Sequence, residues 1–199
     1  MRTAPIPTRQ PPDPVLDRAR AGDRESQSRL LRAHARLVES TLRRIVGATP
    51  DLEDLVQEVF VEVVRGLPRY RGDALFTTWL HRVVVHVACR WLRAPRRRTG
   101  AIALVADDLP SEASPIGELA TRRAFERAHE LLDRLTPVKR VAFLLHVALG
   151  YSTREVAALM GSSHPTAKAR IWFARRELDA LCREDATLGE WVATGRRAP

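Results

Sequence analysis

The sequence has few cysteines and no long apolar run, and both shortages exclude broad classes of protein. Cys89 and Cys182 are the only cysteines in 199 residues, and they lack the spacing of a zinc site or a disulfide framework. A reduced, cytoplasmic setting is the simplest expectation. No stretch has the roughly 20 consecutive apolar residues that a membrane-spanning helix needs, so we expect no membrane insertion.

Groups that could carry catalysis are also missing. The sequence has no glycine-rich phosphate loop, no cluster of metal ligands and no pairing of a nucleophile with a base. His81 and His86 are five residues apart, which is poor spacing for sharing a metal on one helix face. We therefore expect no metal, no other cofactor and no catalytic residue, and we predict that the protein is not an enzyme.

What the sequence has in excess is positive charge. It carries 33 Lys and Arg residues against 24 Asp and Glu residues, a formal net charge of +9, and only Lys139 and Lys168 are lysines. This excess favours a polyanionic partner such as a nucleic acid. Because an excess of arginine can also come from coding bias, the position of the charge is more informative than its total.

The apolar pattern predicts the fold class. Apolar residues recur with helical spacing, and no strand-like alternation persists. The sequence therefore predicts an all-α protein with two small helical domains joined by a flexible linker. The expected parts are a disordered proline-rich arm over 1–13, a first domain over 14–94, a linker over 95–115, a second domain over 116–182 and a tail over 183–199 that contains Trp191.

The most informative stretch of the second domain is 151–178. Ser152 and Glu155 form a capping box, Gly161 ends the first helix, and Ser163 can cap a second one. The second helix has no acid between positions 162 and 176, and one stripe of it is apolar: Ala167, Ile171, Ala174 and Leu178. Two short helices, a glycine turn and a basic outer face indicate a helix-turn-helix that binds DNA. The alternative is an ordinary helical hairpin with a solvated basic face.

An acidic helix is predicted over 51–67 in the first domain. Positions 51–62 hold five acids and no base, although the whole protein is basic. Val61 lies in the middle of the polar face, among Asp54, Gln57 and Glu58. An apolar residue ringed by acids suits a protein partner with a basic surface. The alternative is a solvated acidic face with one stray valine, and a metal site would need a further ligand that is not in register.

A loop and a basic helix come next in the chain. Proline at 68 and glycine at 72 break the acidic helix, and a threonine at 77 or 78 can cap the next one, which runs to about position 93. One face of that helix is mainly basic and consists of Trp79, Arg82, His86, Cys89, Arg90 and Arg93. Arginines beside a loop with Tyr70 and Phe76 suit single-stranded or opened DNA, because cations follow phosphates and rings stack on bases. Trp79 can instead be a packing residue at the helix start.

Taken together, these motifs resemble the RNA polymerase sigma factors of the extracytoplasmic-function group, a bacterial family. The first half carries AGDRES at 21–26, DLEDLVQEVFVEV at 51–63 and YRGDALFTTWLHRVV at 70–84. The second half carries LLDRLTPVKRVAFLL at 131–145 and GYSTREVAALMGSSHPTAKARIWFARREL at 150–178. The resemblance implies two helical domains, regions two and four, without the domain that larger sigma factors place between them.

The resemblance also implies a function and three sets of site residues. The protein would bind core RNA polymerase, direct it to specific promoters and assist promoter melting and transcription initiation. The acidic helix would dock on the largest subunit of the polymerase through Asp54, Gln57, Glu58 and Val61. The minus-ten promoter element would contact Tyr70, Arg71, Gly72, Asp73, Phe76, Trp79, Arg82, His86, Arg90 and Arg93. The minus-thirty-five element would contact Ser163, His164, Thr166, Lys168, Arg170, Arg175 and Arg176. An inhibitory anti-sigma factor would be a further partner.

The recognition helix departs from the family pattern at five positions, which leaves the DNA sequence that it reads open: Ser162, Pro165, Ala167, Trp172 and Phe173. The main rival interpretation is a regulator that binds duplex DNA as a dimer through the helix-turn-helix alone. Such a regulator would not need the acidic helix with Val61. A second rival, an enzyme that acts on nucleic acid, has no catalytic constellation in the sequence to support it.

Overall fold

The computed structural model describes residues 9–47, 49–94 and 127–185, and within these ranges every regular element is a helix. The elements are α1 (Pro14–Arg20), α2 (Arg24–Val46), α3 (Leu52–Gly66), the 3-10 turn η1 (Leu67–Arg69), α4 (Phe76–Arg93), α6 (Pro137–Val147), α7 (Thr153–Leu159) and α8 (His164–Glu184). Residues 127–132 are helical as well. The all-α prediction is confirmed. The predicted linker, the first residues of the predicted second domain, and the tail from 186 onward, which contains Trp191, lie outside the described residues.

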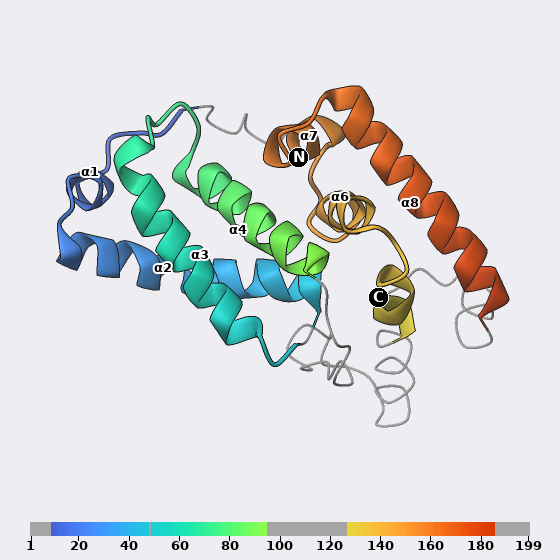
Figure 1. Cartoon of the computed structure of the whole chain (residues 1–199). Helices are drawn as coiled ribbons and strands as arrows, with labels where there is room; N and C mark the ends of the chain where they lie inside the picture. The colour runs from blue at the N-terminus through green and yellow to red at the C-terminus, as the bar shows by residue number, and fades with distance from the viewer. Residues whose placement is uncertain (1–8, 48, 95–126, 186–199) are drawn as a thin grey trace, which may run out of the picture.

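Elements α1 to α4 make up the first half of the molecule (Figure 1). Helices α2, α3 and α4 pack against one another, and α1 packs against α2. The side chains between them are those that the helical spacing predicts, with Val38, Val59 and Val84 fully buried. Asp23 caps α2 by accepting a hydrogen bond from the N–H of Ser26.

Helices α6, α7 and α8 make up the second half, and each contacts the other two. Ala167 and Ala174 of α8 are fully buried, and their small side chains let α8 approach its neighbours closely. A separate apolar cluster joins the end of α8 to α6 and to the turn before it; its buried members are Leu131, Leu132, Leu135, Leu144, Ala174 and Leu178.

The two halves pack against each other, which the sequence does not reveal. Helix α6 contacts both α2 and α4, and α7 contacts α4 (Figure 1). One continuous apolar cluster includes Val87 of α4 together with Leu145 of α6 and Val156 of α7. The sequence predicts two domains on a linker, but the structure buries side chains of both in a common core.

Arg140 of α6 provides the central polar contact between the halves. Its side chain is only 2% exposed, and its Nε donates a hydrogen bond of 3.0 Å to the backbone carbonyl of Ile45, near the end of α2. Asp133 pairs with the same guanidinium. Burial lowers the pKa of Arg140 to about 10, so the group stays charged at neutral pH. At a second point, the hydroxyl of Tyr151 and Nδ1 of His81 share a hydrogen bond of 2.8 Å.

Local predictions fail at three places in the first half. Helix α4 begins at Phe76, and Leu75 occupies the N-cap position, so the predicted threonine cap is wrong. Cys89, which the helical spacing places on the basic outer face, is 8% exposed and belongs to the core. The arm expected to be disordered is described from residue 9 onward, where Gln10 bonds to a loop and Asp13 caps α1.

Replacing Arg140 with methionine keeps most of the side-chain volume but removes the donor to the Ile45 carbonyl. The last carbonyls of a helix have no partner within the helix. A buried polar group left without its partner costs about 1–3 kcal/mol, and we expect the free energy of unfolding to fall by that amount in urea denaturation. Arg134→Met, on an exposed neighbour, is the matched control and should change stability by no more than about 0.5 kcal/mol. Equal losses in both variants would contradict the assigned role of Arg140.

Candidate functional site

Helices α7 and α8 form the helix-turn-helix that the sequence predicts. The hydroxyl of Ser152 accepts from the N–H of Glu155, and the Glu155 carboxylate accepts from the N–H of Ser152 at 2.8 Å, so the capping box is confirmed. Hydrogen bonds with the side chain and then the backbone of Ser152 lower the pKa of Glu155. Gly161, in the turn, has a φ of +57°, which favours glycine. Ser163 caps α8 by accepting from the N–H of Thr166.

Helix α8 has a buried and an exposed face. The predicted stripe Ala167, Ile171, Ala174 and Leu178 is buried. Six of the predicted DNA-contacting residues are exposed: Ser163, His164, Thr166, Lys168, Arg175 and Arg176. Arg170 is half-buried and lies near α4, where burial raises the pKa of the Cys89 thiol and the charges of Arg93 and Arg170 oppose that rise. One end of α8 therefore lies close to the basic helix of the other half.

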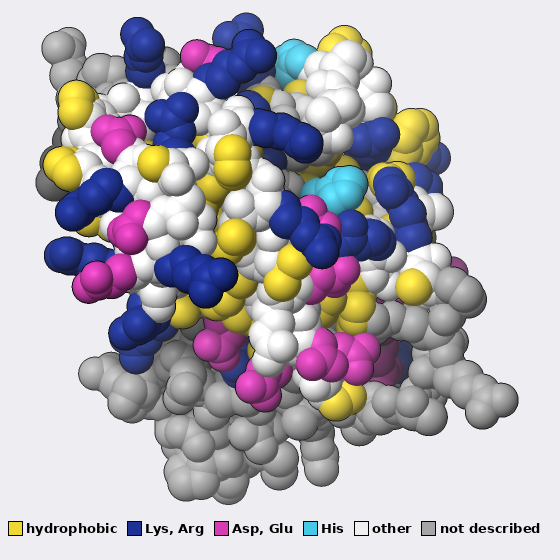
Figure 2. Space-filling view, turned by 60° about the vertical axis from the view of Figure 1, so that its left-hand side comes forward, with side chains coloured by type: hydrophobic (Ala, Val, Ile, Leu, Met, Phe, Trp, Pro, Cys, Tyr) yellow, Lys and Arg dark blue, Asp and Glu magenta, His cyan; other side chains and the backbone are white. Residues whose placement is uncertain are grey.

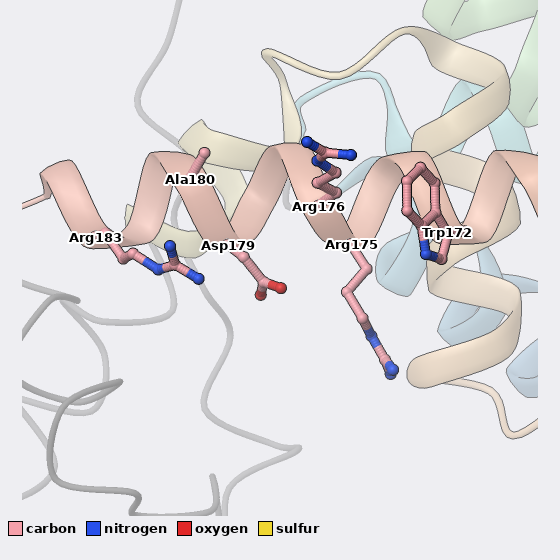
Figure 3. A pocket seen from close by; sticks show the side chains of 6 residues that line it. All are labelled: Trp172, Arg175, Arg176, Asp179, Ala180 and Arg183. Carbon is pink, nitrogen blue, oxygen red and sulfur yellow. The ribbon is translucent and has the colours of Figure 1, made fainter.

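Two exposed aromatic residues on α8 have no place in the predicted site. Trp172 is 53% exposed and Phe173 is 48% exposed, and their rings form an edge-to-face pair with centroids 4.9 Å apart. Arg176 lies over the Trp172 ring, 5.4 Å from its centroid. A shallow pocket on α8 is lined by six residues whose side chains Figure 3 shows: Trp172, Arg175, Arg176, Asp179, Ala180 and Arg183. The only feature of the sequence that pointed to these exposed rings was the departure from the family pattern at positions 172 and 173.

The acidic face of α3 is exposed as predicted. Asp54 and Gln57 are exposed, Glu58 is half-buried, and Val61 is 47% exposed although it is apolar. The opposite face carries Leu55 and Val59 into the core. In a space-filling view, acidic and basic side chains and small hydrophobic patches share the surface (Figure 2).

An ion-pair cluster joins this acidic face to the basic helix. One Nη atom of Arg90 on α4 lies 2.5 Å from a carboxylate oxygen of Glu58 and 3.5 Å from one of Glu62. The three side chains are between about one third and one half exposed, so the pairs are surface pairs of small net stability. The residues predicted to meet a protein and those predicted to meet DNA are thus neighbours.

The loop before α4 is built around buried rings. Tyr70 is 5% exposed and Phe76 is 4% exposed, and Trp79 packs between them with ring centroids 5.3 Å and 5.6 Å away. A Cβ atom at Gly66 would lie 2.8 Å from the Trp79 ring, so this glycine makes room for the indole. The interpretation of Trp79 as a packing residue is the one that fits. All three rings shape the loop from inside, and none of them is an exposed stacking surface.

The remaining predicted residues of this region divide into loop and helix. Arg71 and Asp73 are exposed on the loop, and Gly72 between them has a φ of +78°. On α4, the exposed residues are Arg82, His86, Arg90 and Arg93. The loop and the basic face of α4 therefore form one continuous stretch of the first half, and their arginines are accessible.

The described part of the chain holds no group of three or more metal-binding side chains. In the same ranges, no helix is both long and apolar enough to cross a membrane. The charged surfaces of α3, α4 and α8 can bind charged macromolecules through complementary charge.

Comparison with known proteins decides the family. The model of sigma-70 region 2 matches residues 30–99, and the model of sigma-70 region 4 matches residues 125–178. The ECF RNA polymerase sigma-E factor of Escherichia coli strain K12 is 31% identical over 175 residues, which cover 83% of this chain and 91% of that protein. The chain belongs to the ECF sigma factors of RNA polymerase. It is therefore a promoter-specific sigma factor, a transcription initiation factor.

Other known proteins are similar to this chain over most of its length. The RNA polymerase sigma-H factor of Pseudomonas aeruginosa is 25% identical over 181 residues, 86% of this chain and 94% of that one. Among solved structures, CnrH in complex with the cytosolic domain of CnrY aligns with a TM-score of 0.61 at 24% identity, covering 86% of this chain and 97% of that chain. RpoE in complex with the anti-sigma factor NepR from Bartonella quintana aligns with a TM-score of 0.53 at 16% identity, covering 79% and 97%. Both likenesses show that this chain shares its fold with those two proteins.

Ser152→Ala removes the side-chain half of the capping box. Loss of a serine N-cap costs about 1 kcal/mol, and we expect urea denaturation at neutral pH to show a loss of this size. Because the pKa of Glu155 is lowered in the folded state, its stabilising contribution is present above its unfolded pKa of about 4.3 and is lost as the pH falls through the folded value. The variant should therefore lose less stability than the wild type between about pH 5 and about pH 3.

Ser40→Ala, at a serine inside α2 that caps no helix, is the control for this experiment. It should leave both the stability and its pH dependence within about 0.5 kcal/mol of wild type. An unchanged pH profile in Ser152→Ala would show that the capping box does not set the pKa of Glu155.

Proposed function

We propose that this sigma factor docks on the largest subunit of core RNA polymerase through α3, contacts the minus-ten element through the loop 70–75 and α4, and contacts the minus-thirty-five element through α8. The observation that carries the proposal is the exposure of Val61, 47%, in the middle of an acidic face. A free protein gains nothing from an apolar side chain in water, whereas a protein partner with a basic surface would cover it. We place region two over 14–94 and region four over 116–182. The family models, which match 30–99 and 125–178, support the presence and the order of the two regions.

The proposed docking residues are Asp54, Gln57, Glu58 and Val61. In the free protein, the Glu58 carboxylate forms an ion pair with Arg90. A basic surface of the polymerase would compete for that carboxylate, and because a surface ion pair is worth little, the exchange would be easy. Docking would then leave Arg90 free to bind a DNA phosphate, so polymerase binding and DNA binding would support each other.

The proposed minus-ten contacts divide into a loop that takes a base and a helix that holds the strand. Exposed Arg71 and Asp73 flank Gly72 on the loop, and buried Tyr70 and Phe76, with Trp79, support it from inside. On α4, the exposed residues Arg82, His86, Arg90 and Arg93 would follow the phosphates of the adjoining strand. Capture of a flipped base in the loop would draw the duplex toward the melted state.

The proposed minus-thirty-five contacts lie on α8, in the geometry of a recognition helix in the major groove. Ser163, His164, Thr166, Lys168 and Arg170 occupy its first turns, and Arg175 and Arg176 would lie along the DNA backbone. His164 shares a hydrogen bond of 2.8 Å with the Thr153 hydroxyl, so its ring is fixed against α7 before DNA arrives.

The two halves would have to separate when both elements are bound. The minus-ten and minus-thirty-five elements are separated by about 25 base pairs, as their names indicate. This spacing corresponds to roughly 85 Å of B-form DNA at about 3.4 Å per base pair. In the structure, α7 of the second half contacts α4 of the first. The packed state is therefore a state of the free protein, and engagement of a promoter would break the Arg140 and Tyr151 contacts.

We further propose that the protein acts in the cytoplasm, where RNA polymerase works, and that it carries out no catalysis itself. An inhibitory anti-sigma factor is a further proposed partner, and the complex of RpoE with the anti-sigma factor NepR supports it by likeness. The rival interpretation is a dimeric regulator that binds duplex DNA without polymerase. Duplex binding by the free protein, together with no binding to core polymerase, would favour this interpretation.

Asp54→Arg combined with Val61→Lys should weaken binding to purified core RNA polymerase by roughly 30-fold or more, the loss typical of a hot spot. Both side chains are exposed, so the fold should be kept. Glu184→Arg, an exposed charge reversal at the end of α8, is the control and should bind like the wild type. Affinity can be measured by fluorescence anisotropy without DNA, and an unchanged affinity of the double variant would remove α3 as the docking face.

Lys168→Ala should weaken binding of the holoenzyme to a promoter fragment that the wild-type holoenzyme selects from a randomised library. Loss of one phosphate contact should reduce the slope of log affinity against log salt by about 1. Lys139→Ala is the matched control, because Lys139 is the other lysine of the sequence and pairs with Glu177 on the side of α6. Identical salt slopes for the two variants would contradict the placement of Lys168 on DNA, and core polymerase binding should stay unchanged in both.

A further inference from the structure

Helix α4 starts without a cap of its own. Its first residue is Phe76, and Leu75 at the N-cap position has no side chain that could accept a hydrogen bond. The first N–H groups of a helix have no partner within the helix, and a neighbouring polar side chain usually supplies one. Because α4 comes directly after the proposed minus-ten loop, whatever caps it also fixes where the loop ends.

The missing cap comes from Gln10, which lies 66 positions earlier in the chain. Its Oε1 accepts a hydrogen bond of 2.8 Å from the N–H of Phe76. Its backbone N–H donates a second hydrogen bond, 3.1 Å, to the carbonyl of Gly72 in the middle of the loop. Gln10 therefore holds the backbone at two points, at Gly72 in the turn of the loop and at Phe76, the first residue of α4.

The loop is tightly shaped between these two points. Gly72 has a φ of +78°, which a residue with a side chain rarely adopts, and a Cβ atom added there would lie 3.7 Å from the Cβ of Gln10. The hydroxyl of Tyr70 donates to the carbonyl of Ala74 across the loop. The backbone around the exposed Arg71 and Asp73 is thus fixed by contacts that involve neither of these side chains.

Gln10 is itself held in place by the residues that come next in the chain. Pro11 and Pro12 restrict the backbone to a narrow φ range. Asp13 then caps α1 by accepting from the N–H groups of Val15 and Leu16. Helix α1 contacts η1, the turn that leads into the loop. Residues 10–13 therefore connect α1 to the loop. The two prolines reduce the conformational entropy that is lost when Gln10 forms its hydrogen bonds with the loop and α4.

We propose that Gln10 is a positioning residue for recognition of the minus-ten element: it caps α4 and holds the loop 70–75 in the conformation that reads DNA. This inference rests on the proposed function, because it takes the loop to be the minus-ten reader. Gln10 acts through the loop backbone, and direct contact with DNA is not required. Without the cap, the loop would sample other conformations and discriminate less between bases.

The test compares two substitutions of Gln10 in the polymerase holoenzyme. Gln10→Met keeps the side-chain length and removes the acceptor, whereas Gln10→Glu keeps an acceptor oxygen, and negative charge is favourable at a helix N-terminus. Gln27→Ala is the matched control, since the Gln27 amide also bonds to a backbone carbonyl, that of Ala19, but away from the loop. Each holoenzyme selects promoter fragments from a library randomised separately at the minus-ten and minus-thirty-five positions.

Gln10→Met should lower discrimination at the minus-ten positions by roughly fivefold, the scale of losing one cap. It should leave the minus-thirty-five preference and core binding unchanged. Gln10→Glu should restore most of the minus-ten preference, and Gln27→Ala should match the wild type. Hydrogen exchange of the Phe76 amide in the free protein should be faster in Gln10→Met alone, which reports the lost cap directly.

A minus-ten preference in Gln10→Met equal to that of the wild type would overturn this inference and leave the proposed function standing. The inference would also be overturned if Gln10→Glu lost as much minus-ten preference as Gln10→Met. The loss could then not be caused by removal of the hydrogen-bond acceptor. If Arg71→Ala with Asp73→Ala leaves the minus-ten preference of the holoenzyme unchanged, the loop is not the reader, and the proposed function of the loop fails together with the inference.

Discussion

The guanidinium of Arg140 must find polar partners in a place that excludes water, and much of the arrangement of this sigma factor depends on that requirement. Its bond to the Ile45 carbonyl satisfies an end of α2 that the helix itself cannot satisfy. The same contact fixes α6 against α2, and the apolar cluster around it runs from α4 to α7. Packing of the two halves is thus specified by one buried cation as well as by apolar area.

Packing of the helices brings acidic and basic surfaces next to one another. The acidic face of α3 and the basic face of α4 meet at the ion pairs of Arg90 with Glu58 and Glu62. The half-buried Arg170 of α8 lies near Cys89 of α4, the residue before Arg90. In the free protein, the acidic face of α3 therefore neutralises Arg90 of α4 within the first half, and the second half places Arg170 near the same helix.

The loop before α4 depends on segments distant in sequence. Rings of Tyr70, Phe76 and Trp79 fill its inner side, and Gly66 of α3 provides space for the indole. The loop's outer shape depends on Gln10 of the arm. The proposed role of the loop in reading bases would require a rigid loop. Packing of the rings and the cap supplied by Gln10 would provide this rigidity, while the exposed side chains stay free for contact.

The sequence alone determined most of the features that depend on neighbours within a few residues. The helical spacing predicted the polar face of α3 and the buried face of α8, and the cap signals at Ser152 and Ser163 are confirmed. The exposure of Val61 was also predictable, because helical spacing places it on the same face as the polar residues of α3 and opposite the apolar residues that pack into the core. These features could be predicted because helix periodicity and capping are local.

Only the tertiary structure decided which surfaces meet. The sequence placed Cys89 and the rings of the loop on a DNA-facing side, but packing against the second half and within the first half buries them. It also offered threonine as the cap of α4, whereas the cap comes from Gln10. No local pattern encodes a hydrogen bond between residues 66 positions apart, or the meeting of Arg140 with Ile45, because such contacts exist only once distant helices have packed.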